Sequence, residues 1–318
     1  MADITPRCRL LELPPELLIT LAEFLNPASK VLLSFACKRL HDVLNILSKK
    51  ELSTLSDSEY DDYLSAMVSG IGLHDRFACV CHRLHNVEAH DFPGVTRGLA
   101  WNGCWPASAK LGSVFTKYCL HQRHIQLALR SSSSGAQNAR LTRILRPFRE
   151  RGNSVFNPCS WEFSAQPLIA QGNFMVHINE TFEPLYNSHI TMGQCQFIKI
   201  CPHIMASPRW SADTAHYLLR QHLEQIIEQQ GSQTDGYCTR CATEFSLRST
   251  DTGLEIDIWY DFGSDPSPSS PSWISHVSCS EDGFDANPEV IQHTRFESAD
   301  ETRLRRMFNG ALKDVQSC

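Results

Sequence analysis

Long apolar runs are absent from this sequence. No stretch approaches the roughly 18 consecutive apolar residues of a membrane-spanning helix, and the first residues, MADITPRCR, hold no apolar core of a secretory signal. We therefore expect no membrane partner and a location in the cytoplasm or nucleus. In such a reducing compartment the 13 cysteines, a high and odd number, indicate free thiols or metal ligands rather than a disulfide framework.

An excess of positive charge is also absent. With 29 Lys and Arg against 35 Asp and Glu, the net charge is −6, which argues against a nucleic-acid partner. The charges are unevenly spread, since residues 110–151 hold nine bases and one acid, whereas residues 255–301 hold eleven acids and one base. Either these intervals form surfaces that steer a partner, or they face each other or solvent within one fold. We favour the second interpretation.

Catalytic signatures and internal repeats are missing as well. The sequence has no G-x-S-x-G, no H-E-x-x-H and no Gly-rich phosphate loop ending in G-K-[ST]. Gly103-Cys104-Trp105 matches a papain-type nucleophile poorly, because the second cysteine of that signature is missing. We expect no enzymatic activity, and a thiol hydrolase is kept as a lesser alternative. No repeat period marks a known recognition scaffold.

Residues 10–47 contain a strong helical pattern. Pro14-Pro15 suits a helix start, where a missing N–H costs nothing. Asn26-Pro27 ends this helix, and Ser29 is expected to cap the next one. Apolar residues recur at helical spacing throughout. The segment therefore predicts three short helices that share a small apolar core.

The same residues resemble an F-box. The match consists of an LPxELL segment from Leu13, a C-[KR]-x-L segment from Cys37 and spaced leucines between them, over about an eighth of the chain. The resemblance implies docking on the Skp-type adaptor of a cullin–RING ubiquitin ligase. The adaptor-binding residues that it implies are Leu13, Pro14, Leu17, Leu18, Leu21, Leu32, Leu33 and Leu40. The alternative is an unrelated small helical hairpin with leucines at these spacings.

The rest of the chain predicts a second domain. We expect an F-box over residues 8–50 and an α+β domain over residues 51–318 that combines helices with a small antiparallel sheet. Helices are expected at residues 58–69, 115–130 and 212–230 and around Leu304–Leu312, after a capping box at residues 298–301. Strands are expected at residues 174–178, 196–200, 243–248 and 254–262.

Cysteine and histidine cluster in three elements of this domain, at residues 77–90, 201–203 and 238–245. Cys238 and Cys241 form a C-x-x-C pair, whose spacing is common in tetrahedral zinc sites. The best candidates for the other two ligands are Cys201 and His203, which would complete a closed structural site. A weaker second set comprises Cys79, Cys81 and His85. The alternatives are buried thiols or, for the C-x-x-C pair, a redox site.

The order of these elements resembles the F-box proteins of filamentous fungi. The resemblance rests on Cys81-His82-Arg83-Leu84-His85, Cys201-Pro202-His203 and the segment from Cys238 to Phe245, but Ala78 stands where that family usually has a cysteine. The resemblance implies a substrate receptor in the ubiquitin-like conjugation pathway. Such a subunit acts through protein–protein interactions: it binds the adaptor, and through the adaptor a cullin, and it recruits an unknown protein substrate. The alternative is a zinc-stabilised binding module with a vestigial F-box.

Overall fold

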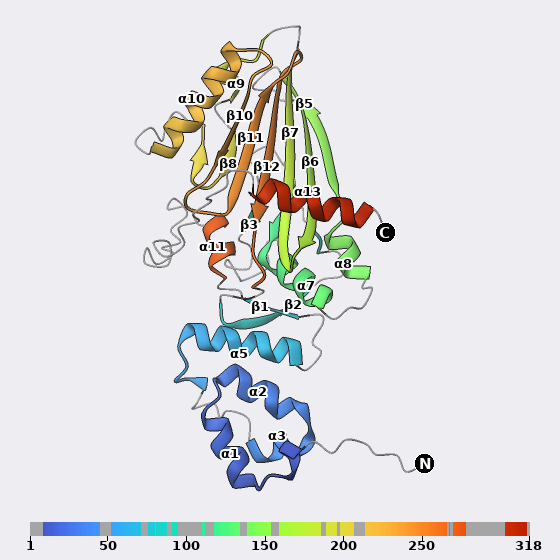
Figure 1. Cartoon of the computed structure of the whole chain (residues 1–318), viewed down its shortest axis with the longest axis vertical. Coiled ribbons are helices and arrows are strands. Elements are labelled where there is room, and N and C mark those ends of the chain that lie inside the picture. Colours follow the sequence, from blue (N-terminus) through green and yellow to red (C-terminus); the bar gives the residue numbers. More distant parts are fainter. Residues whose placement is uncertain are drawn as a thin grey trace. The chain divides into compact units, whose positions relative to one another are not determined.

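Two compact units make up the chain (Figure 1). The first comprises residues 1–89 and 267–269, and the second comprises residues 90–266 and 270–318. The computed structural model describes residues 9–44, 52–70, 76–79, 81–87, 91–94, 110–111, 118–133, 139–153, 159–185, 189–195, 198–206, 214–265, 267, 270–277 and 303–316. None of the helices described there combines the length and apolarity needed to cross a lipid bilayer.

Short helices and one hairpin form the first unit. They are η1 (Arg9–Glu12), α1 (Pro15–Glu23), α2 (Pro27–Ala36), α3 (Lys38–Leu44), α5 (Asp57–Gly70), β1 (Arg76–Cys79) and β2 (Arg83–Asn86). The expected three helices correspond to α1, α2 and α3. The cap of α2 differs from the prediction: Asn26 Oδ1 accepts a hydrogen bond from the backbone N–H of Ser29 at 2.7 Å. Asn26 is therefore the cap, and Pro27 occupies the first turn.

The core of the first unit joins the three N-terminal helices to the elements that follow them. Val31 of α2 packs with Tyr63 and Leu64 of α5 and with Ala78 of β1. Helix α5 begins with a capping box, in which the backbone N–H of Ser56 donates to the Glu59 carboxylate at 2.9 Å. Because α5 and the hairpin complete this core, the first compact unit continues to residue 89 and includes more than the segment expected to form the F-box.

A six-stranded antiparallel sheet organises the second unit, in the order β10-β11-β12-β7-β6-β5. Its strands are β5 (Phe148–Asn153), β6 (Cys159–Ala170), β7 (Asn173–Pro184), β10 (Gln233–Tyr237), β11 (Thr243–Ser249) and β12 (Leu254–Asp261). Around it lie β3 (Lys110–Leu111), β4 (Leu120–His121), β8 (Lys199–Cys201), β9 (Ile204–Met205), α7 (Gln122–Ser133), α8 (Ala139–Ile144), α9 (Met192–Cys195), α10 (Thr214–Glu228), α11 (Pro271–Val277) and α13 (Arg303–Gln316).

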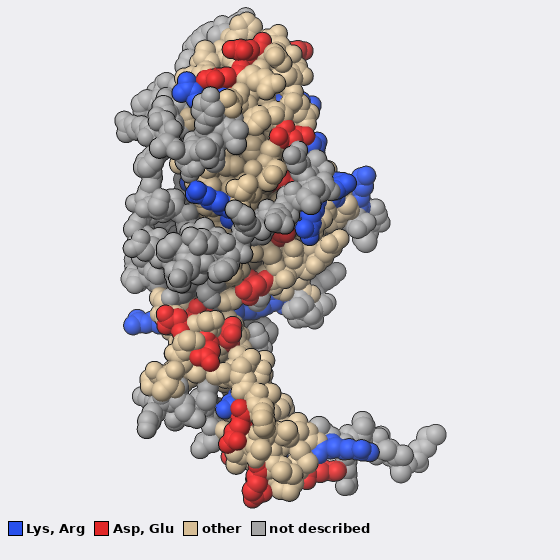
Figure 2. Space-filling model, turned by 60° about the vertical axis from the view of Figure 1, so that its left-hand side comes forward, with Lys and Arg blue, Asp and Glu red and all other residues tan. Residues whose placement is uncertain are grey.

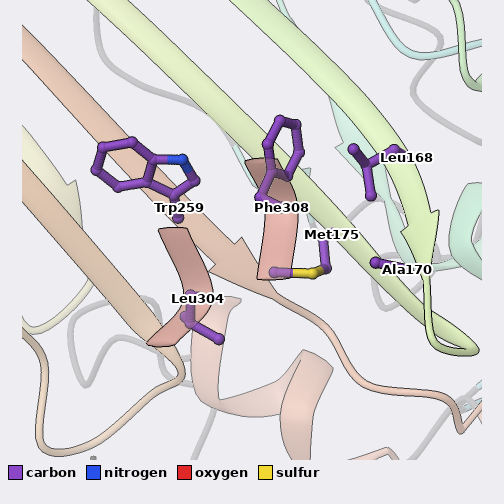
Figure 3. Packing of buried hydrophobic residues seen from close by; sticks show 6 residues of the cluster. All are labelled: Leu168, Ala170, Met175, Trp259, Leu304 and Phe308. Carbon is purple, nitrogen blue, oxygen red and sulfur yellow. The ribbon is translucent and has the colours of Figure 1, made fainter. Parts of the chain in front are cut away.

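The C-terminal helix α13 covers part of one sheet face. Leu304 and Phe308 of α13 pack against Trp259 of β12, Met175 of β7 and Leu168 of β6 (Figure 3). Helix α13 begins against a buried carboxylate: Glu244 of β11 accepts hydrogen bonds from the backbone N–H groups of Leu304 and Arg305, at 2.9 and 3.1 Å. An anion at a helix N-terminus is favourable, so the sheet fixes where this helix starts.

The predicted fold class, α+β with N-terminal helices followed by a mixed helix and antiparallel-sheet domain, is confirmed. The helix expected at residues 115–130 begins only at Gln122, because Leu120 and His121 pair with residues 110–111 as a short β-ribbon. Strands β5, β6 and β10 were not predicted, so the sheet is larger than expected. The capping box expected at residues 298–301 lies outside the described residues.

Candidate metal centre and exposed helical face

Five large apolar side chains are exposed on α1, its C-terminal cap and α2. The exposed fractions are 50% for Leu17, 46% for Ile19, 46% for Leu21, 83% for Phe24 and 46% for Leu32. We call this set the exposed helical face. It holds every strongly exposed large apolar residue in the part of the chain that the structure describes. Leu17, Leu21 and Phe24 recur at i, i+4 and i+7 and so lie on one side of the helix, whereas Ile19 points to another side. Exposed apolar side chains that gather on one side of a helix are typical of a surface that binds another protein.

The eight residues predicted to bind an adaptor divide by burial. Pro14, Leu17, Leu21 and Leu32 are exposed, and Leu13 and Leu33 are half-buried. Leu18 and Leu40 are only 1% and 2% exposed, so in this unit they belong to the core rather than to a docking surface. Neighbouring helical positions point about 100° apart, which explains why Leu17 and Leu18 differ. The prediction did not include Ile19 and Phe24.

The predicted metal ligands Cys201, His203, Cys238 and Cys241 come together inside the second unit. Cys201 ends β8 and His203 lies in the turn before β9, while Cys238 and Cys241 lie in the turn between β10 and β11. All four side chains are buried, and their ligand atoms lie within 4.8 Å of one another. Two turns that are distant in the sequence therefore form one closed group of three sulfurs and one nitrogen, which could bind a metal ion.

The spacing of these atoms suits a tetrahedral ion. His203 Nδ1 lies 3.6 Å from Cys238 Sγ and 3.9 Å from Cys201 Sγ. Metal–sulfur and metal–nitrogen distances of about 2.3 and 2.0 Å give tetrahedral edges of about 3.6 Å between S and N. The observed separations are near that edge and are long for hydrogen bonds. The backbone N–H of Arg240 donates to Cys238 Sγ at 3.4 Å, so the turn itself supports a thiolate.

Burial and the contacts among the three thiols give these thiols different pKa values. Burial raises the pKa of Cys201 and of Cys241 well above the ordinary value. Hydrogen bonds from Cys201 and Cys241 lower the pKa of Cys238. Cys238 is therefore the thiol of the three whose ionised form the surroundings favour most. A divalent ion would favour the loss of the remaining protons, because the thiolate is the form that binds metals.

Surrounding groups hold the two turns in place. The Tyr260 hydroxyl of β12 donates to the carbonyl oxygen of Ile200, next to Cys201. The His276 ring of α11 lies 3.2 Å from the carbonyl oxygen of Ala242, next to Cys241, and 2.6 Å from that of Ser272. These contacts therefore anchor the ligand turns to the sheet and to α11. In structural metal sites, outer-sphere partners orient the ligands in the same way.

The weaker predicted set also comes together, in the first unit. The ligand atoms of Cys79, Cys81 and His85 lie within 4.8 Å of one another on the β1–β2 hairpin. Cys79 is buried, whereas the other two side chains are half-buried. Cys104 and His90, which the sequence also singled out, lie outside the described residues.

A buried ionic cluster that the sequence did not reveal lies near α7. Asp91 accepts hydrogen bonds from Arg123 at 2.8 Å and from His124 Nε2 at 3.1 Å, and all three side chains are at most 1% exposed. Although burial opposes ionisation, the hydrogen bonds from His124 and Arg123 hold the pKa of Asp91 well below its usual range. Burial lowers the pKa of His124. Since His124 Nδ1 accepts the backbone N–H of His121 at 3.2 Å, its Nε2 carries the proton.

The basic and acidic intervals find partners elsewhere in the second unit. Arg151 pairs with Glu162 at 3.0 Å, and Glu255 accepts a hydrogen bond from Arg248 at 2.9 Å. On the face shown in Figure 2, positive and negative side chains of this unit are interspersed. These two pairs lie within the second unit.

Comparison with known proteins identifies one family. Residues 10–52 match the family model of the F-box domain, so the predicted F-box is confirmed. F-box domains bind Skp-type adaptors, and F-box proteins are in general non-enzymatic adaptors. No curated protein and no solved structure matches the chain. The narrower resemblance to the F-box proteins of filamentous fungi receives no support from these comparisons.

Proposed function

We propose that the protein is a substrate-receptor subunit of a cullin–RING ubiquitin ligase of the SCF type. In this proposal the F-box docks on a Skp-type adaptor and through it on a cullin, in the cytoplasm or nucleus. The second unit recruits a protein substrate, and other subunits supply the chemistry of ubiquitin transfer. The observation that carries the proposal is that the exposed helical face lies within residues 10–52, the segment that matches the F-box.

The chemistry of this face supports a protein partner. Leu17, Leu21 and Leu32 are each about half exposed. A partner that buried one of them completely would therefore gain about half of the roughly 1.5–3 kcal/mol that the burial of a whole leucine side chain provides. Helix α1 has two buried residues, Leu18 and Ala22, so the opposite side of the helix is already used in the core. An adaptor that covered the exposed side would give α1 a second apolar interface.

The second unit has the features of a stable platform. In our proposal Cys201, His203, Cys238 and Cys241 hold a structural Zn²⁺, because a buried, closed set of three cysteines and one histidine is a frequent structural zinc site. The ion would join the β8–β9 turn to the β10–β11 turn and leave no open position for catalysis.

Co-expression of the full chain with a Skp-type adaptor, followed by gel filtration, tests the proposal. We expect a one-to-one complex that the triple variant Leu17→Ala, Leu21→Ala, Leu32→Ala weakens by more than about 100-fold, since central apolar residues of an interface each contribute about 1–2 kcal/mol or more. The control variant Arg220→Ala, Glu224→Ala removes an exposed ion pair on α10 and should bind as the wild type does.

Two outcomes would contradict the proposal. Adaptor capture that survives the triple substitution would show that this face is not the docking surface. A wild-type chain that carries zinc and ignores the adaptor would instead favour the alternative of a zinc-stabilised binding module with a vestigial F-box. The folded state of the triple variant is checked by its helical circular dichroism, which should match that of the wild type because all three residues are exposed.

A further inference from the structure

The β1–β2 hairpin of the first unit carries a second group of soft ligands. The Sγ atoms of Cys79 and Cys81 and a ring nitrogen of His85 lie within 4.8 Å of one another. The hairpin brings them together through its register, which pairs Phe77 with His85 and Cys79 with Arg83. Cys79 and His85 are therefore diagonal neighbours on one face of the ribbon, and Cys81 approaches them from the turn.

The turn is built to hold this arrangement. His82 adopts a positive φ of 56°, and its backbone N–H donates to the carbonyl oxygen of Cys79 at 2.8 Å. The His85 ring stacks on Phe77, with 5.4 Å between centroids and 27° between planes. These two contacts orient the turn and the imidazole before any ligand binds.

Distances show which of the two nearby histidines faces the thiols. The His82 ring faces α5, with Nδ1 3.1 Å from Asp61 Oδ1 and Nε2 3.5 Å from Asp57 Oδ1. The His85 ring instead faces sulfur, with Nε2 3.1 Å from Cys81 Sγ. This contact is a hydrogen bond, and it needs to open by only about 0.5 Å to reach the S–N edge of a tetrahedral zinc site.

We infer that Cys79, Cys81 and His85 form a second zinc site, independent of the buried four-ligand centre. It supplies three protein ligands, and its half-buried position leaves the fourth to water or to another donor. Two four-residue strands are marginal as an isolated hairpin, so a bound ion would stabilise this ribbon. Ala78 and Leu84 of the hairpin pack into the core around Val31 of α2. The ion therefore stabilises the unit that carries the F-box helices.

The zinc content of the full chain, without adaptor, tests this site. We expect two zinc ions per wild-type chain and one in His85→Asn or Cys81→Ser. Cys241→Ser, in the four-ligand centre, should also retain one ion. The matched control is Cys37→Ser, which removes a half-buried thiol of the same unit outside either cluster and should retain two.

A wild type with one ion that His85→Asn leaves unchanged would overturn the inference. Cobalt(II) titration of the wild type gives a measurement without variants, since two sites require two equivalents before the thiolate–cobalt absorption saturates, whereas saturation at one equivalent contradicts a second site. The effect on the adaptor rests on the proposed function: His85→Asn should then weaken adaptor capture. Because metal is counted without adaptor, failure of adaptor binding and failure of the second site are distinguishable.

Discussion

The two units differ in how they place their large apolar residues. The first unit leaves Leu17, Phe24 and their neighbours exposed, although it is small. Among its described residues, the second unit leaves no large apolar side chain strongly exposed, and it buries the carboxylate of Asp91 with an arginine and a histidine. The first unit also buries one carboxylate, Asp61, beside the partly exposed His82. A unit that exposes apolar surface is completed by a partner, whereas a unit that buries ionic groups depends on its own internal pairing. Substitutions that change one unit and leave the other unchanged test this difference between the units.

The largest expected effect comes from Asp91→Asn in the second unit. The substitution leaves the guanidinium of Arg123 buried without its carboxylate, and breaking a buried pair in this way costs about 3–5 kcal/mol. All six tryptophans lie in the second unit, so their fluorescence follows its unfolding in denaturant separately from the first unit. The exposed helical face should still bind the adaptor.

The pH dependence provides the control for this variant. Because the folded state lowers the pKa of Asp91, its contribution to stability is complete above the unfolded value of about 3.9 and is lost as the pH falls below it. The stability difference between wild type and Asp91→Asn should therefore shrink as the pH falls from about 5 to 3. Acid release of the zinc that we propose should affect both proteins alike. If the stability difference between the two proteins stayed constant with pH, the charge of Asp91 would not contribute to the stability of the second unit.

A smaller effect is expected from Leu18→Ala in the first unit, compared with Leu17→Ala. Leu18 is 1% exposed, so its truncation leaves a cavity and should lower stability by about 2–5 kcal/mol. Leu17 is 50% exposed, so its truncation should change stability by less than about 0.5 kcal/mol while weakening adaptor binding. Hydrogen exchange of amides in residues 9–44 measures the stability. Equal losses of protection in the two variants would remove the distinction between core and docking residues.

The sequence predicted the parts of the structure that depend on short-range patterns. The helical spacing of residues 10–47 predicted α1 to α3, and the alternation of Ile256, Ile258 and Tyr260 with polar residues predicted β12. The C-x-x-C pair and the C-P-H element predicted the four residues that the fold brings together, because both lie in tight turns. These predictions succeed where the local pattern alone determines which side of an element is buried.

Strand β6 was not predicted, and its sequence contains Pro167. Proline cannot donate a hydrogen bond and argues against a central strand. In the structure β5 pairs with β6 only as far as Phe148 and Ala165, so Pro167 lies beyond that edge and no β5 residue is registered opposite it. The partner Val176 lies on the other side, in β7. Pro167 is tolerated because β5 ends before it is reached, and the sequence does not show where β5 ends.

The buried ionic cluster was beyond the sequence. Asp91 and Arg123 are 32 residues apart and belong to no motif, so only the folded chain brings them together.

The sequence placed His85, and not His82, in the weaker ligand set. His82 follows Cys81 by one residue and His85 follows it by four. Their different neighbours, Asp61 for His82 and Cys81 for His85, follow from the hairpin register and from the position of α5.

The smallest effect that we predict concerns the start of α2. Asn26→Ala removes the acceptor for the backbone N–H of Ser29 and should cost about 1 kcal/mol. In a unit of this size that corresponds to a fall in melting temperature of about 4–8 °C, which circular dichroism of the helices can detect while tryptophan fluorescence stays unchanged. Asn26→Asp retains a capping oxygen and should stay close to the wild type. If Asn26→Ala also lowered the tryptophan transition, the two units would not unfold independently, and the contrast between them would have to be replaced by a single cooperative structure.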